Sequence, residues 1–135
     1  MDDINKAKIF NELELQRKSY GLTFADMDRI FENNGFNYSG DRWVQNEFND
    51  HVYYWFGWNM KACNLYWEYM KKYNLKRLPT NLLMYLTSGK VPNMPIVKAK
   101  SVKQFMKYKT DHWFPVQIVT KEEYDRALMQ KEGIK

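Results

Sequence analysis

The strongest constraint on the fold of this chain is the apolar pattern of residues 41–73. Apolar residues recur there at steps of three and four, with Asn59 filling one gap, and the phase continues across Gly57. Such spacing is typical of an amphipathic helix. The stripe consists of Val44, Phe48, Val52, Trp55, Ala62, Tyr66, Met70 and Tyr73. It predicts one central helix over 41–73, roughly 50 Å long from the rise per residue of an α-helix.

Shorter helices are predicted before and after this central helix. They span residues 3–18, 23–34, 80–89, 101–110 and 121–132. Ser101 is the predicted N-cap of one of them. Two others begin with capping boxes, Thr23 with Asp26 and Thr120 with Glu123, in which side chain and backbone satisfy each other's hydrogen bonds. These signals support helices packed on both sides of the central one.

Together these elements predict a mainly α fold, a compact helical domain built on the central helix, with room for one short β-ribbon. The ribbon would pair residues 94–98 with 112–119, where Pro115 allows only an edge strand. A chain of 135 residues is the usual size of a single domain. The expected parts are an acidic helical hairpin (1–40), the central helix (41–73) and a basic C-terminal region (74–135).

Composition favours a cytoplasmic protein. The sequence has no run of the roughly 18 apolar residues that a membrane helix needs, and its acidic start does not resemble a signal peptide. Cys63 is the only cysteine, so no intramolecular disulfide is expected. Lysines outnumber arginines sixteen to five, and there are twelve asparagines, a bias common in AT-rich phage and bacterial genomes. We therefore expect an intracellular protein of phage or mobile-element type, active in an infected bacterial host.

The charge of the chain is unevenly distributed. Residues 1–50 carry ten acids and six bases, whereas residues 71–110 carry ten bases and no acid. Such a field attracts polyanions. The ten bases are Lys71, Lys72, Lys76, Arg77, Lys90, Lys98, Lys100, Lys103, Lys107 and Lys109. We expect this lysine-rich segment to form a face that contacts the phosphates of nucleic acid or an acidic partner.

Several aromatic residues fall outside the predicted apolar stripe or within the basic segment. They are Tyr54, Trp58, Trp67 and Tyr108. Aromatic side chains on a basic surface stack on nucleic-acid bases. Exposed rings equally form protein interfaces, so these four are candidates for base stacking or for contact with a protein partner, including a second copy of the chain.

Catalytic motifs are weakly represented. The two histidines follow aspartates, as Asp50-His51 and Asp111-His112, but no metal-binding or nucleophile motif surrounds them. The glycines are scattered singly and form no phosphate-binding loop. We therefore assign no catalytic residue, no metal site and no cofactor, and we expect structural or exposed histidines.

The sequence thus favours a non-enzymatic binding protein whose basic residues 71–110 engage nucleic acid or a nucleoprotein complex. Inhibition of a host defence nuclease is the specific hypothesis that fits a phage-like origin. The alternative class is a protein-interaction or assembly module, for instance a homodimer, that uses exposed aromatics. A weaker alternative is a nuclease that uses the two Asp-His pairs.

Overall fold

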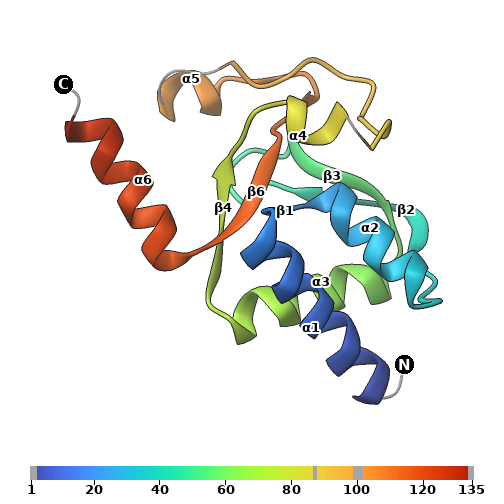
Figure 1. Cartoon of the computed structure of the whole chain (residues 1–135). Helices are drawn as coiled ribbons and strands as arrows, with labels where there is room; N and C mark the ends of the chain where they lie inside the picture. The colour runs from blue at the N-terminus through green and yellow to red at the C-terminus, as the bar shows by residue number, and fades with distance from the viewer. Residues whose placement is uncertain (1–2, 87, 99–101, 134–135) are drawn as a thin grey trace.

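The computed structural model describes residues 3–86, 88–98 and 102–133 (Figure 1). Within this part of the chain, helices alternate with strands, and the strands form two three-stranded sheets. The fold is therefore mixed α/β. The prediction of a mainly α domain built on one long central helix is wrong.

The stretch predicted as the central helix folds into a β-hairpin followed by a shorter helix. These elements are β2 (Ser39–Gln45), β3 (Val52–Trp58) and α3 (Met60–Lys72). Asn46 forms the turn between the strands, because its side-chain oxygen accepts hydrogen bonds from the backbone N–H groups of Phe48 (2.7 Å) and Asn49 (3.0 Å). Local bonds of this kind compete with helical ones. The turn therefore breaks the helical phase before the aromatic run of β3 begins.

Gly57 and Asn59 set the boundary between the hairpin and α3. Gly57 has a φ of +81°, which lies outside the right-handed helix. Asn59 then caps α3, since its side-chain oxygen accepts a hydrogen bond from the backbone N–H of Ala62 at 2.9 Å. From this cap onward the predicted stripe holds, with Ala62 and Tyr66 buried. Phe48, also predicted on that stripe, is 73% exposed in the turn.

The second sheet joins segments that are far apart in the sequence. It consists of β1 (Leu22–Thr23), β6 (Val116–Thr120) and β4 (Leu75–Pro79), in the order β1-β6-β4 and with antiparallel pairing. Ile118 lies in register with Leu22 on one side and with Arg77 on the other. In the hairpin sheet, β5 (His112–Trp113) pairs in parallel with β3. Both sheets therefore depend on the C-terminal third of the chain.

Helices cover these sheets and extend beyond them. They are α1 (Asp3–Ser19), α2 (Phe24–Asn33), α4 (Leu83–Leu86), α5 (Val102–Met106) and α6 (Lys121–Gly133). The capping boxes predicted at Thr23 and Thr120 are both confirmed. Helix α1 lies against α3, with the rings of Phe10 and Tyr69 5.6 Å apart, whereas α6 projects from the body of the molecule (Figure 1).

The C-terminal region contains less regular structure than predicted. Helices α4 and α5 are shorter than the predicted helices 80–89 and 101–110, and the predicted cap Ser101 lies outside the described residues. The predicted ribbon is represented, in the described chain, by a single parallel bridge between Ile96 and Trp113. The main partner of residues 116–120 is instead β4.

Aromatic rings fill the core. Phe24, at the start of α2, lies between Trp55 (6.2 Å between ring centroids), Trp58 (5.6 Å) and Tyr66 (5.2 Å). All four residues are at most 1% exposed. Many of the aromatic residues, which make up 17% of the chain, therefore pack in the core and do not lie at the surface. No helix in the described ranges is both long and apolar enough to cross a membrane.

Candidate nucleic-acid interface

The structure divides the basic residues of 71–110 between two ends of the molecule. Lys71, Lys72 and Lys76 lie at the end of α3 and on β4, at the bottom of Figure 1. Lys107 and Lys109 follow α5, at the top of the same view. Lys98, also exposed, lies near them, because its backbone N–H donates to the hydroxyl of Tyr108 at 2.8 Å. Lys100 and the side chain of Lys103 lie outside the described residues. The described bases therefore do not share one surface.

Arg77 is engaged inside the protein. Its guanidinium forms an ion pair with Glu47, donates to the hydroxyl of Tyr66 at 3.2 Å and lies 4.3 Å from the centre of the Tyr54 ring. Only 15% of its side chain is exposed. Burial by itself would lower the pKa of Arg77, but Tyr66, Tyr54 and Glu47 outweigh burial and raise it. Arg77 therefore organises its neighbours and has little surface left for a phosphate.

Lys90 also forms an ion pair, with a carboxylate that is buried in the fold. Its ammonium group pairs with Asp28, which is 4% exposed, and lies 5.2 Å from the centre of the Tyr38 ring. Asp28 also accepts hydrogen bonds from the indole Nε1 groups of Trp55 (3.2 Å) and Trp58 (2.7 Å). A cavity of about 300 Å³ opens beside this group. The charge of Lys90 is thus needed to neutralise Asp28.

The four predicted aromatic contacts have different environments. Trp58 is fully buried and Tyr54 is 5% exposed, so neither ring can stack on a base at the surface. Tyr108 packs on His112, with ring centroids 4.0 Å apart. Trp67, on α3, is 48% exposed. Of the four, Trp67 retains the largest exposed aromatic surface.

A second exposed tryptophan, Trp43, was missed by the sequence analysis. It lies on β2, is 41% exposed, and packs against Tyr53 (4.8 Å between centroids) and Phe56 (5.6 Å). Trp43 lies outside the predicted helical stripe, and no function was predicted for it. The exposed positions Ser39 to Trp43 show no alternation that could have identified Trp43 from the sequence.

Trp43 and Trp67 line the same hollow, and Trp67 also borders a second one. The first hollow, of about 440 Å³, includes Arg42 and Cys63 in its walls. The second, of about 450 Å³, is lined by Trp67 together with residues of the α3–β4 connection. We define the Trp67 surface by Arg42, Trp43, Met60, Cys63, Trp67, Lys71 and Lys76.

The Trp67 surface carries more cations than acids. Arg42, Lys71 and Lys76 are exposed, and none of them forms an ion pair within the described part of the chain. Glu47 is occupied by Arg77, and Asp41 lies in the wall of the first hollow. The surface therefore combines exposed rings with a net positive charge from three cations and one acid.

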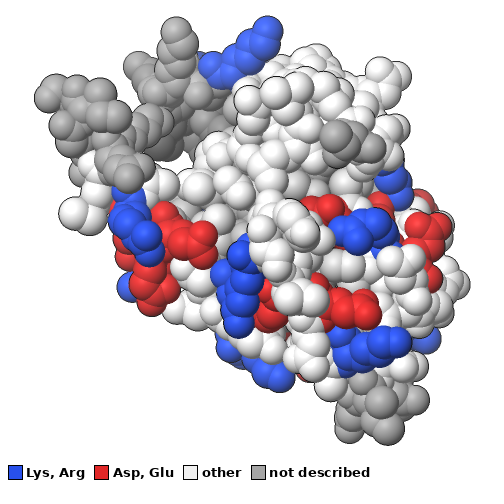
Figure 2. Space-filling model, in the orientation of Figure 1, with Lys and Arg blue, Asp and Glu red and all other residues white. Residues whose placement is uncertain are grey.

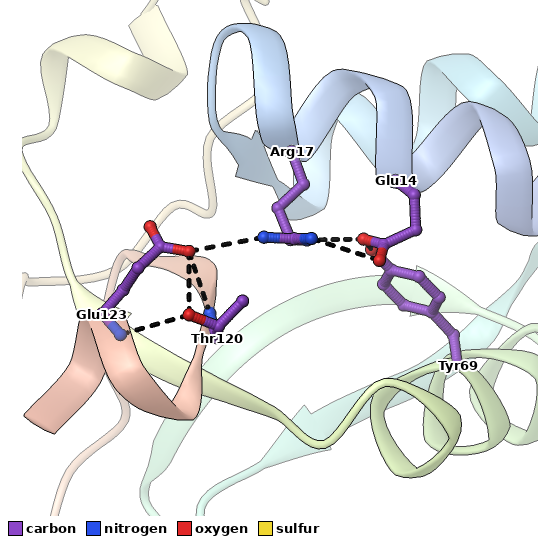
Figure 3. Close-up of polar contacts among 5 residues, drawn as sticks. All are labelled: Glu14, Arg17, Tyr69, Thr120 and Glu123. Carbon is purple, nitrogen blue, oxygen red and sulfur yellow. Dashed lines mark hydrogen bonds and ion pairs between the residues drawn. The ribbon is translucent and has the colours of Figure 1, made fainter.

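Other faces show a different charge pattern. On the side turned to the viewer in Figure 2, basic and acidic side chains are interspersed. One such group links α1, α3 and α6 and is partly exposed (Figure 3): Arg17 donates to Glu14 (3.1 Å) and to Glu123 (3.3 Å), and Tyr69 donates to Glu14 (3.0 Å). These charges join α1, α3 and α6 to one another. Their role is structural.

The two Asp-His dipeptides, Asp50-His51 and Asp111-His112, are brought together by the parallel pairing of β3 and β5. Nδ1 of His51 lies 3.2 Å from a carboxylate oxygen of Asp111. His112 instead directs Nδ1 to the carbonyl of Thr110 at 2.7 Å. The register pairs Val52 with His112, so alternation places His51 and His112 on opposite sides of the sheet. The described residues contain no group of three or more potential metal ligands.

Comparisons of the chain with family models, curated proteins and solved structures found no match. The chemistry of the Trp67 surface therefore carries the functional argument.

Proposed function

We propose that the protein is a non-enzymatic nucleic-acid-binding protein and that the Trp67 surface is its binding site. In this proposal Lys71 and Lys76 neutralise phosphates, and the exposed ring of Trp67 lies between them and the hairpin. The observation that supports it most directly is the shared border of the two hollows, which places a half-exposed indole next to two lysines without ion-pair partners.

The type of cation supports a backbone contact. Lysine attracts phosphate as a point charge, whereas arginine is the usual reader of guanine edges. Two of the three exposed cations of the Trp67 surface are lysines, Arg42 being the third, and the neighbouring Arg77 is bound to Glu47 and Tyr66. We therefore propose binding that tolerates many sequences. A nucleoprotein complex with accessible phosphates offers the same chemistry, and inhibition of a defence nuclease would be one consequence of such binding.

The proposal is tested by reversing charge at one end of the molecule and then at the other. A Lys71→Glu, Lys76→Glu double variant is expected to weaken binding of a labelled oligonucleotide by roughly ten-fold or more, because two phosphate contacts become repulsive. The matched control is Lys98→Glu with Lys109→Glu, which makes the same charge change among exposed residues near α5. Fluorescence anisotropy at two salt concentrations measures the affinity of each double variant for the oligonucleotide.

Absence of salt-sensitive binding by the unmodified protein would overturn the proposal. Equal losses in the two double variants would show that net charge, rather than the Trp67 surface, controls binding. The exposed Trp43, Met60 and Trp67 also fit the second candidate, a protein-interaction surface. Self-association that is lost on changing Trp43 and Trp67, without any nucleic-acid binding, would favour that candidate.

A further inference from the structure

The indole of Trp67 is held in place before any partner binds. The guanidinium carbon of Arg77 lies 5.4 Å from the centre of the Trp67 ring, and the neighbouring Tyr66 ring is 5.1 Å away. Arg77 is itself fixed by Glu47 and by the Tyr66 hydroxyl. A ring supported in this way loses little conformational entropy when a flat partner packs on it.

Trp43 is a second supported ring that lines the first hollow. Tyr53 and Phe56, both on β3, pack against it from the neighbouring strand. Met60 and Cys63, from the first turn of α3, line the same hollow as the two tryptophans. Two aromatic side chains from different elements thus share one hollow of about 440 Å³, whose walls also carry the polar side chains of Arg42, Asp41 and Gln45.

We infer that the occupant of this site is an unpaired nucleic-acid strand, whose bases stack on Trp43 and Trp67 while its phosphates lie near Arg42, Lys71 and Lys76. The inference rests on the proposed function and narrows it. Inside a duplex the faces of the bases are covered by their neighbours, so an exposed indole can stack only on a base that is free. The pairing of stacking rings with unpaired cations is the arrangement that binds single strands with little sequence preference.

The first test compares unpaired and paired strands of the same length. Oligothymidylate is expected to bind at least roughly ten-fold more tightly than a duplex at equal salt and to quench tryptophan fluorescence. Trp67→Ala and Trp43→Ala are each expected to weaken oligothymidylate binding by roughly five-fold or more and to leave duplex binding unchanged. Tyr20→Ala is the matched control, because Tyr20 is an aromatic residue that is 83% exposed away from the hollow.

The second test needs no substitution. Cys63, the only cysteine of the chain, lines the hollow and is half-buried. Burial raises the pKa of its thiol, which Arg42 partly offsets, so alkylation is measured at alkaline pH, where the thiolate forms. Saturating oligothymidylate is expected to slow alkylation of Cys63 several-fold, and the same concentration of duplex is expected to have little effect.

The outcomes separate the inference from the proposed function. Equal affinity for oligothymidylate and duplex, with unchanged affinity in both tryptophan variants and no protection of Cys63, would overturn the unpaired-strand inference and leave phosphate binding by Lys71 and Lys76 standing. No salt-sensitive binding of either strand would overturn both. Loss of binding in Tyr20→Ala to the same extent as in Trp67→Ala would also overturn the inference, since stacking would not be specific to the hollow.

Discussion

Asp28 illustrates how single side chains decide which of the basic residues are free. The carboxylate is 4% exposed and accepts hydrogen bonds from two buried indoles, Trp55 and Trp58. A buried carboxylate is costly unless it is both hydrogen-bonded and paired with a cation. The indoles supply hydrogen bonds but no charge, so Lys90 must supply it. Arg77 is likewise paired, although there the cation is the less exposed partner, at 15% against 43% for Glu47, whereas Lys71 and Lys76 form no ion pair within the described residues.

Lys90→Met is expected to destabilise the protein by about 1–3 kcal/mol, because it leaves the Asp28 carboxylate without a cation. The value lies below that of a fully buried pair because 40% of the Lys90 side chain is exposed. Urea denaturation measures the loss. In the Asp28→Asn background, Lys90→Met is expected to cost less, since no buried charge remains. Equal costs in the two backgrounds would contradict this role for Lys90.

The Lys90 pair also has a defined pH dependence. Burial lowers the pKa of Lys90, but the hydrogen bond and charge of Asp28 outweigh burial and raise it above the ordinary lysine value. The stabilisation of the folded state by the Lys90–Asp28 pair is therefore fully present below the pKa of lysine in the unfolded chain. It is lost as pH rises through the higher pKa of Lys90 in the folded state. The stability difference between the unmodified protein and Lys90→Met is accordingly expected to shrink only in strongly alkaline solution.

At the scale of elements, local signals were reliable and the long apolar pattern was not. The predictions of both capping boxes were correct because the hydrogen bonds of a capping box join residues only three positions apart. Residues 52–58 are apolar or aromatic at almost every position, so they match the helical period and the strand period alike. The deciding residues were Asn46 and Asn49 in the turn and Gly57 near the end of β3. Their preference for turns and positive φ should have outweighed the stripe.

Gly57→Ala distinguishes the two structures by the sign of its effect. In a continuous helix the change would stabilise by about 1 kcal/mol. At a φ of +81° an alanine is strained, although its Cβ would have space, so the expected result is a destabilisation of about 1–2 kcal/mol. Asn64→Ala is the control, because Asn64 is exposed on α3 and a gain of a few tenths of a kcal/mol is expected. A stabilising Gly57→Ala, measured by thermal or urea unfolding, would contradict the hairpin.

At the scale of the whole molecule, the sequence named some of the residues of the proposed site but not all of them. Trp67, Lys71 and Lys76 were candidates because of their charge or their position off the stripe, and all three are exposed. Their neighbours Arg42 and Trp43 were not, because they come from a hairpin that the sequence analysis had placed in a helix. The partners of Arg77 and Lys90 lie 30 and 62 positions away, a distance over which composition gives no guidance.

The positions of the basic residues determine how steeply the affinity for nucleic acid depends on salt concentration. If all ten bases of 71–110 contacted phosphates of an unpaired strand, the slope of log affinity against log salt would be about −7, whereas contacts from Arg42, Lys71 and Lys76 alone give about −2. We expect the shallower slope, because the fold separates the bases of α3 and β4 from those near α5 and engages Arg77 and Lys90 internally. Titrations of oligothymidylate over a series of salt concentrations measure it. The Lys98→Glu, Lys109→Glu variant should keep the same slope, and a slope near −7 that this variant reduces would show that the two ends bind one strand together.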